Sequence, residues 1–345
     1  MGSNVLQVAY SLIDAFWVGR LGADAVASVS ISIPIMFLMV AAGLGFAVAG
    51  TTLIAQYFGA GDRAMVNHVA GQTLLTIIVL SVILGIIGFV VSPYVLDLMG
   101  TVPDVRDNAI AFLRIAFIGL PFAFMYFMFQ ALLRGTGEVT VPLYIVAGTV
   151  FLNFCLDPIL IFGMFGLPHM GVKGAALATL IAQGIAAAVG LWLLMGGRYG
   201  IALDWQSFKP DFAFIKRAFF LGYPASIEQS ARGFGMTVMT FLITSFGTIT
   251  IASYGVGVNV INLVVIPAMG FSMATSTLVG QNIGAGNIAR AERVARLAAL
   301  ITFVSLSVVG LICFVFAANL VAFFVPKDAA VIREGAVFIR IVSWS

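Results

Sequence analysis

A few polar side chains lie inside long apolar stretches of this 345-residue chain, where ionisable groups are costly and are expected to have a function. Asp14 lies in the first stretch, and Asn153 and Asp157 lie four residues apart in a later one. A spacing of four places two side chains on the same face of a helix. Pro158 follows directly and removes a backbone N–H donor, which leaves a carbonyl oxygen free near the carboxylate.

These oxygen atoms predict a site for a small cation. Hard cations such as Na⁺ prefer carboxylate and carbonyl oxygens, and a carboxylate can equally hold a proton. If Asp14 faces Asp157, the two ionised groups repel each other, so a proton or a metal cation is the natural counter-charge. We therefore interpret Asp14, Asn153 and Asp157 as a cation-coupling site, with H⁺ and Na⁺ both open. The alternative is that each aspartate caps a broken helix or pairs with a Lys or Arg.

Two further features could bind charged ligands. Glu228 precedes Arg232 by four residues, which fits either a functional carboxylate or a neutralised salt bridge within the membrane. Six aromatic side chains crowd residues 117–129 and could line a cavity for flat organic cations. The alternative for these aromatic side chains is that they face lipid or pack against other helices.

The composition excludes a water-soluble protein. Only 9% of the residues are Asp, Glu, Lys or Arg and 61% are hydrophobic, whereas an average soluble domain has about 25% charged residues. So few charges cannot cover a soluble surface of this size, and the solvent must be lipid. The net charge of +3 does not suggest nucleic acid as a partner, and two cysteines in apolar stretches predict no disulfide framework.

The apolar stretches predict an all-α, polytopic transmembrane bundle, because about 30 Å of hydrocarbon takes roughly 20 helical residues to span. About ten helices are expected. They are a partial helix that ends near Val18, a last helix that starts near Glu334, and spans at 28–55, 66–92, 108–133, 140–164, 173–195, 218–243, 251–280 and 294–324. Since the first and last helices are incomplete, we expect the chain to be truncated at both ends.

An internal repeat organises these helices. With Gly19 aligned to Thr244, residues 19–61 match residues 244–286 without a gap, and the match is best at the end of the second helix. There Thr52, Leu53, Gln56, Gly59, Ala60 and Gly61 recur as Thr277, Leu278, Gln281, Gly284, Ala285 and Gly286. After one inserted residue, "AFLRI" at 111–115 corresponds to "VFIRI" at 337–341. A parallel repeat of six helices is typical of two-lobed transporters.

The repeat predicts an N-terminal lobe at 1–195, a cytoplasmic linker at 196–217 and a C-terminal lobe at 218–345, with ten helices present of an expected twelve. Nine Lys and Arg residues fall on the side chosen as cytoplasmic and seven on the outer side. The cytoplasmic set is Arg63, Arg134, Arg198, Lys209, Lys216, Arg217, Arg290, Arg293 and Arg296. Met239 occupies the position equivalent to Asp14, so the acid pair belongs to the first lobe alone.

Several motifs together give the chain a family resemblance. They are "YSLIDAFWVGRLGADAVASVS", "AQYFGAGD", "LRGTGEVTVP", "NFCLDPILIFG", "MGVKGAALAT", "YPASIEQ" and "GQNIGAGN". With them the chain resembles the multidrug and toxic compound extrusion (MATE) transporters, in their prokaryotic DinF-type branch. The resemblance implies a twelve-helix exporter that moves organic cations or amphipathic compounds outward in exchange for H⁺ or Na⁺.

The resemblance also implies a set of site residues. The first-lobe cation site of similar proteins falls on Asp14, Asn153, Asp157 and Thr179. Phe112 stands where such proteins often carry a tyrosine, so one hydroxyl is missing for Na⁺. A glutamate that other branches use in the seventh helix falls on Glu228, a candidate second-lobe site.

The resulting expectation is a multi-pass transporter of the cell membrane that uses no cofactor beyond its coupling ion. We expect a monomer in membrane lipid, with small amphipathic or cationic substrates and no nucleic acid. One alternative is a lipid-linked oligosaccharide flippase of the same superfamily, although only Arg232 would supply a cavity cation. Another is an intramembrane aspartyl protease built on Asp14 and Asp157, but neither aspartate lies in the Gly-x-Gly-Asp segment of such enzymes.

Overall fold

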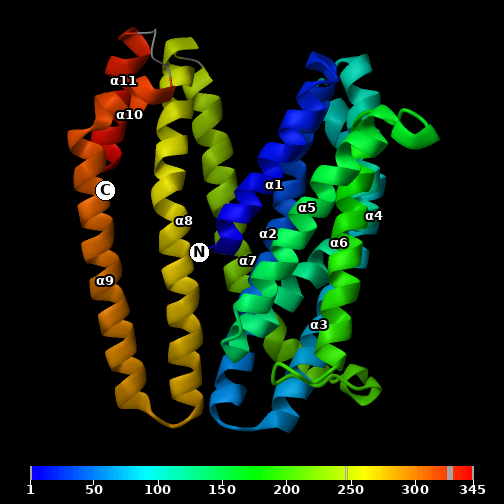
Figure 1. Cartoon of the computed structure of the whole chain (residues 1–345), viewed down its shortest axis with the longest axis vertical. Coiled ribbons are helices and arrows are strands. Elements are labelled where there is room, and N and C mark those ends of the chain that lie inside the picture. Colours follow the sequence, from blue (N-terminus) through cyan, green and yellow to red (C-terminus); the bar gives the residue numbers. More distant parts are fainter. Residues whose placement is uncertain (1, 245, 247, 325–328, 344–345) are drawn as a thin grey trace. The chain divides into compact units, whose positions relative to one another are not determined.

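The computed structural model describes residues 2–244, 246, 248–324 and 329–343, which fold almost entirely into helices (Figure 1). The prediction of an all-α bundle is confirmed. The longer helices are α1 (Gly2–Gly19), α2 (Ala23–Gly59), α3 (Arg63–Leu98), α4 (Pro103–Thr136), α5 (Thr140–Phe162), α6 (Val172–Met195), α7 (Phe212–Thr244), α8 (Thr248–Gly284) and α9 (Ile288–Val315). Shorter ones are α10 (Ala317–Phe324), α11 (Ala329–Val342), and the 3₁₀ turns η1 (Met164–Gly166) and η2 (Trp205–Phe208).

The helices extend beyond most of the predicted spans. Asp62, for example, accepts a hydrogen bond from the backbone N–H of Met65 at 3.0 Å and so begins α3 ahead of the predicted span. Within the described residues, six helices are long and apolar enough to cross a membrane, namely α2 to α6 and α9. The single span predicted at 294–324 is wrong, because Phe316 separates α9 from α10. Lys327, placed on the outer side, lies outside the described residues.

The repeat is visible in the helix boundaries. The offset that aligns Gly19 with Thr244 also aligns both ends of α2 with those of α8, and the start of α3 with that of α9. The start of α11 falls one position beyond the place that the start of α4 predicts, as one inserted residue requires. The break at Phe316 interrupts the second copy where α3 runs on without a break.

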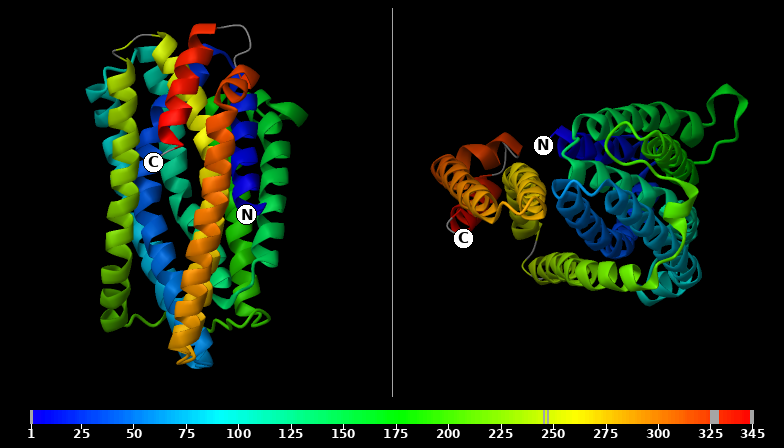
Figure 2. Two further views of the ribbon diagram at one scale, coloured as in Figure 1. Left: turned by 90° about the vertical axis from the view of Figure 1, so that its left-hand side faces the viewer. Right: turned by 90° about the horizontal axis from the view of Figure 1, so that it is seen from below.

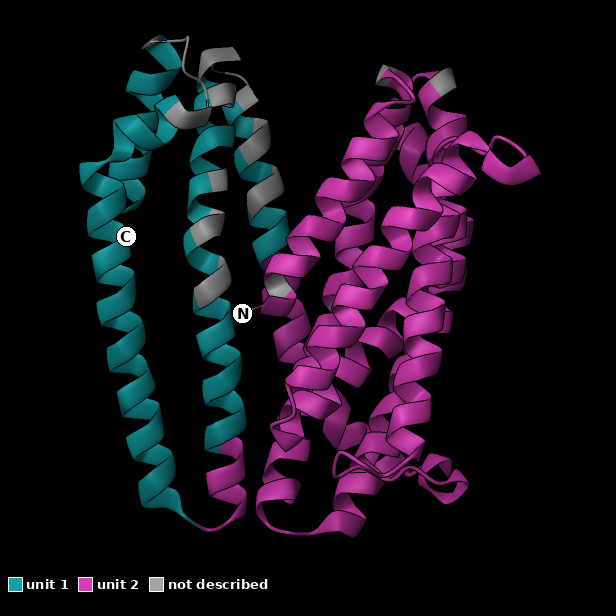
Figure 3. Cartoon of the chain, in the orientation of Figure 1, with its two compact units in different colours: residues 1, 232–279, 287–345 teal, residues 2–231, 280–286 magenta. Residues whose placement is uncertain are grey.

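The chain forms two compact units (Figure 3). One comprises residues 2–231 with 280–286, and the other comprises residues 232–279 with 287–345. Within the second unit α9, α10 and α11 pack together around Cys313, Ala317 and Val321 (Figure 2). The predicted lobe boundaries at 195/196 and 217/218 stay a prediction.

Helix α4 forms the centre of the larger unit, where it packs against α2, α3 and α6. Its side chains Phe117, Phe124 and Phe129 are fully buried. Each ring fills the space above a glycine of a neighbouring helix, and those glycines are Gly88, Gly43 and Gly190 respectively. Small residues allow this close approach between membrane helices. These three aromatic side chains therefore belong to the packed core of the larger unit.

The segment between α6 and α7 is tied to the beginning of α3 through Gln72, which is fully buried. Its amide nitrogen donates to the carbonyl oxygens of Ser207 at 3.0 Å and Lys209 at 2.6 Å, and its carbonyl oxygen accepts from the N–H of Asp211 at 2.9 Å. Gly71 leaves room for this contact, because a Cβ there would overlap the carbonyl oxygen of Ser207.

Asn67 and His68 complete this attachment. Asn67 accepts a hydrogen bond from the N–H of Ala202 at 2.8 Å, and His68 contacts the carboxylate of Asp211 at 3.1 Å. The backbone N–H groups of Ala213 and Phe214 donate to the same carboxylate. These hydrogen bonds, led by that from Phe214, lower the pKa of Asp211 below its usual value.

The repeated Gln-x-x-Gly segments meet each other within the larger unit. A Cβ on Gly59 would overlap the carbonyl oxygen of Gln281, and a Cβ on Gly284 would overlap that of Gln56. Gln281 also donates through Nε2 to the carbonyl oxygen of Gly135 at 3.0 Å. Glycine is required at both positions because backbone lies directly against backbone.

We predict that Gln72→Ala loosens the linker. Its loss leaves two carbonyl oxygens and one N–H without their partner, which costs about 1–3 kcal/mol. Limited trypsin digestion of the purified protein is expected to cut several-fold faster after Arg198, in the same linker. The matched control is Gln206→Ala, an exposed glutamine of the same linker, and equal cleavage rates in the two variants would contradict the role of Gln72.

We predict that Gly284→Ala destabilises the protein by about 1–3 kcal/mol, because the added methyl group forces two backbone segments apart. Thermal unfolding in detergent is expected to show a lower midpoint. The control is Gly255→Ala in the same helix, where a Cβ meets no atom within 4 Å and alanine favours the helix. A midpoint for Gly284→Ala equal to that of the control would argue against the close contact.

Candidate functional site

Three packed helices bring the predicted site residues together. Helix α5 packs against both α1 and α6, and Figure 1 shows the three side by side. Asp14 lies on α1, Asn153 and Asp157 lie on α5, and Thr179 lies on α6. The spacing of four along α5 places Asn153 and Asp157 on one face of that helix, as the sequence predicts.

The site forms a polar layer between two apolar clusters. One cluster contains Leu6, Tyr10 and Ile13 of α1 together with Val146 and Val150 of α5. The other contains later residues of the same helices, namely Trp17, Val18, Ile161 and Phe162, together with Leu21 of the turn after α1. The two clusters use α6 in the same way, through Ala186 and Ala187 on one side and Val172 and Ala175 on the other. Apolar packing thus shields the carboxylates from both sides.

Asn153 and Asp157 are fully buried, with exposed fractions of 0%. The amide nitrogen of Asn153 donates to Oδ1 of Asp157 at 3.3 Å. The carboxyl group of Asp14 lies within interaction distance of both side chains. No Lys or Arg of the described residues forms an ion pair with either aspartate. The alternative in which each aspartate pairs with a basic residue is therefore wrong.

Three buried oxygen atoms of this site have no hydrogen-bond partner among the described residues. They are Oδ1 of Asp14, Oδ1 of Asn153 and Oδ2 of Asp157. A buried polar atom without a partner costs about 1–3 kcal/mol, and more when it carries charge. Oxygens are the ligands that a proton or Na⁺ takes, so the residues fit a small cation. One monovalent cation would cancel one of the two negative charges and so relieve the repulsion between the neighbouring carboxylates.

Sequence reasoning missed Tyr10, whose hydroxyl group is also buried without a partner of good geometry. It lies beside Thr179 and near Asp14. The signal was available, because Tyr10 precedes Asp14 by four residues and so shares its helix face. Phe112 packs in the apolar cluster with Trp17, and Tyr10 supplies a hydroxyl beside the site from another helix.

Glu228 is not among these residues. It lies on α7 with an exposed side chain, one helical turn before Arg232. Its assignment as a second-lobe site stays a prediction.

Comparison with known proteins adds the family. The MatE family profile matches residues 1–159 and 224–345. A curated relative from Bacillus subtilis (strain 168), the probable multidrug resistance protein YoeA, is 32% identical over 330 residues, which span 94% of this chain and 71% of the relative. The probable multidrug resistance protein NorM of Thermotoga maritima is 28% identical over 347 residues, which span 99% of this chain and 73% of the relative.

A solved structure supports the same fold. It is described as the outward-facing conformation of a multidrug resistance MATE family transporter, and it aligns with a TM-score of 0.85 at 24% identity, covering 99% of this chain and 76% of that chain. Membership of a transporter family removes the protease alternative for Asp14 and Asp157. The chain therefore belongs to the MatE family and is a multi-pass membrane transporter of the multidrug resistance type, and not an enzyme.

Proposed function

We propose that the protein exports organic cations or amphipathic compounds across the cell membrane in exchange for H⁺ or Na⁺. Asp14, Asn153 and Asp157 hold the coupling ion, with Thr179 and Tyr10 as neighbouring hydroxyl groups. We expect the protein to act as a monomer, with lobes 1–195 and 218–345 joined by the cytoplasmic linker 196–217.

One observation carries this proposal: three buried, unpartnered oxygen atoms converge from α1 and α5 inside an apolar environment. An ionised pair of aspartates is unfavourable there, so the occupied and empty states differ in charge and in hydrogen bonding. That difference couples ion binding to helix packing, which is what alternating access requires. An ion that bound both states equally would shift nothing.

The flippase alternative has less support. A carrier of lipid-linked oligosaccharides would need several cations in its central cavity, and we expect only Arg232 to serve there. The relatives from Bacillus and Thermotoga are both named as probable multidrug resistance proteins. Efflux of small organic compounds is therefore the function that we test.

We predict that Asp157→Asn reduces ion-driven efflux to background while the protein still folds. The substitution preserves size but removes the charge that attracts the coupling ion. The measurement is efflux of a fluorescent organic cation from proteoliposomes of the intact protein, with a pH gradient and a Na⁺ gradient imposed separately. Asp14→Asn is expected to behave in the same way.

The matched control is Asp24→Asn, the same change at an exposed position in the first turn of α2. It is expected to transport like the wild type. Wild-type efflux by Asp157→Asn under both gradients would remove the site assignment. No efflux by folded wild-type protein under either gradient would favour the flippase.

A second variant distinguishes the two ions. Na⁺ needs several oxygen ligands whereas a proton needs one carboxylate. We therefore predict that Tyr10→Phe raises the Na⁺ concentration for half-maximal transport about fivefold, as expected for a lost interaction of about 1 kcal/mol, and leaves H⁺-driven transport unchanged. Tyr144→Phe, at a lipid-exposed position of α5, is the control. Unchanged Na⁺ dependence in both variants would exclude Tyr10 from the site.

A further inference from the structure

The repeat relates one face of α3 to the equivalent face of α9, and the two faces have different side chains. In the first copy, the beginning of α3 receives the linker through Asn67, His68, Gly71 and Gln72. The equivalent positions of the second copy, in the first turns of α9, are Glu292, Arg293, Arg296 and Leu297. The face of α3 that binds the linker backbone therefore corresponds to a charged face of α9.

Because of these residue differences, the face on α9 cannot bind a chain segment in the way that α3 binds the linker. Gly71 is needed because the carbonyl oxygen of Ser207 lies where a Cβ would be. Its counterpart Arg296 carries a long side chain at that point, so a chain segment cannot lie against α9 as the linker lies against α3. Gln72, which makes three hydrogen bonds to the linker, is replaced by Leu297, whose side chain can make none.

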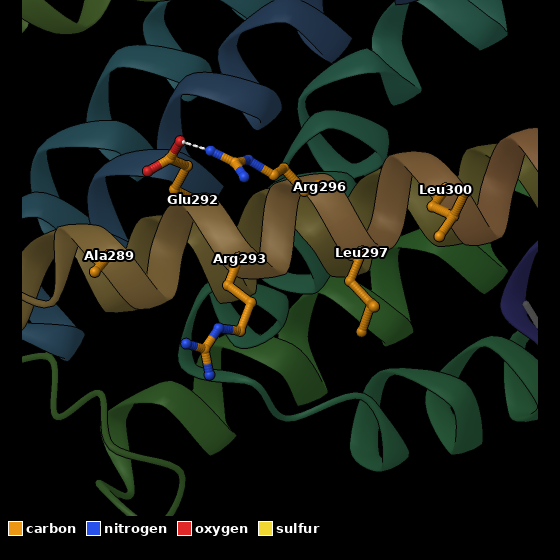
Figure 4. Close-up of a pocket in the computed structure, with 6 residues that line it drawn as sticks. All are labelled: Ala289, Glu292, Arg293, Arg296, Leu297 and Leu300. Atoms are coloured by element: carbon orange, nitrogen blue, oxygen red, sulfur yellow. Dashed lines mark hydrogen bonds and ion pairs between the residues drawn. The ribbon is translucent and has the colours of Figure 1, made fainter.

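The face on α9 forms a hollow of about 330 Å³ (Figure 4). Its lining residues are Ala289, Glu292, Arg293, Arg296, Leu297 and Leu300. Arg296 pairs with Glu292, and Figure 4 shows Arg293 pointing away from that pair. Arg293 makes no hydrogen bond or ion pair with any described residue. The hollow therefore offers an uncompensated cation above Leu297 and Leu300, which are 57% and 59% exposed.

The position of this hollow along α9 indicates which region of the lipid bilayer it meets. Helix α9 is a candidate membrane span from Ile288 to Val315. At about 1.5 Å per residue, the nineteen steps from Arg296 to Val315 measure about 28 Å, close to the hydrocarbon thickness of about 30 Å. The arginines therefore reach the lipid headgroups at one surface, while Leu297 and Leu300 lie at the beginning of the acyl region.

We propose that this face binds the headgroup of an anionic phospholipid. Arg293 would hold the phosphate, with Arg290 and Arg296 adding positive charge, and the acyl chains would lie along Leu297 and Leu300. Three arginines against one glutamate give the segment 290–296 a net charge of +2. Guanidinium groups bind phosphate in a two-pronged geometry, and juxtamembrane basic residues attract anionic lipids on the cytoplasmic leaflet.

The test is equilibrium binding of phosphatidylglycerol to the intact protein in mixed micelles, with phosphatidylcholine as the uncharged comparison. We expect wild-type protein to prefer phosphatidylglycerol. Arg293→Gln is expected to weaken its binding about fivefold and to leave phosphatidylcholine binding unchanged, since one arginine near the surface contributes about 1 kcal/mol. The control Arg333→Gln removes an exposed arginine of α11 and is expected to bind like the wild type.

Glu292→Gln tests for a gain of lipid binding, which a misfolded variant would not show. It removes the carboxylate that pairs with Arg296, so phosphatidylglycerol binding is expected to become tighter. Either of two results would overturn the proposal: equal affinity of wild-type protein for the two lipids, or equal loss of phosphatidylglycerol binding in Arg293→Gln and Arg333→Gln.

Discussion

Hydrocarbon offers no hydrogen bonds, and this constraint shapes every part of the chain. Backbone groups are satisfied within helices, and the few intramembrane polar side chains bond to a nearby carbonyl oxygen or to each other. Against this background, oxygen atoms of Asp14, Asn153 and Asp157 remain buried without partners. A site that leaves such groups unsatisfied is stable only because the packing of α1, α5 and α6 holds it between two apolar clusters.

The same constraint explains how the helices come together. Membrane helices gain little from excluding lipid, so their association depends on close packing. In the larger unit, rings of α4 lie over glycines of α2, α3 and α6. Where the chain leaves the membrane, side-chain hydrogen bonds take over, as Gln72 does for the linker. Close helix packing within the membrane and side-chain hydrogen bonds beyond it together hold the helices that carry Asp14 and Asp157.

The sequence predicts those features that depend on local spacing. Asn153 and Asp157 share a helix face because they are four residues apart, and the constant offset of the repeat anticipates both boundaries of α8 and the start of α9. Contacts between distant segments were harder to predict. That Asp14 faces Asp157 could be stated only as a condition, since it depends on how α1 packs on α5.

Other features were missed for similar reasons. Tyr10 was overlooked although it shares a face with Asp14, because a tyrosine in an apolar helix usually serves packing. Attachment of the linker to α3 depends on Gly71 and Gln72, residues that carry no recognisable motif. The break at Phe316 has no proline or glycine to announce it, so composition alone extended the helix through it.

The contact between the two Gln-x-x-Gly segments bears on how much work a transport cycle requires. Interlocked side chains must be withdrawn before two helices can part, and each leaves a hole behind it. At Gly59 and Gly284 main chain lies against main chain, so separation there withdraws no side chain from a socket. Backbone contacts of this kind can break and form again with the same fit, which suits a transporter that changes conformation in every cycle.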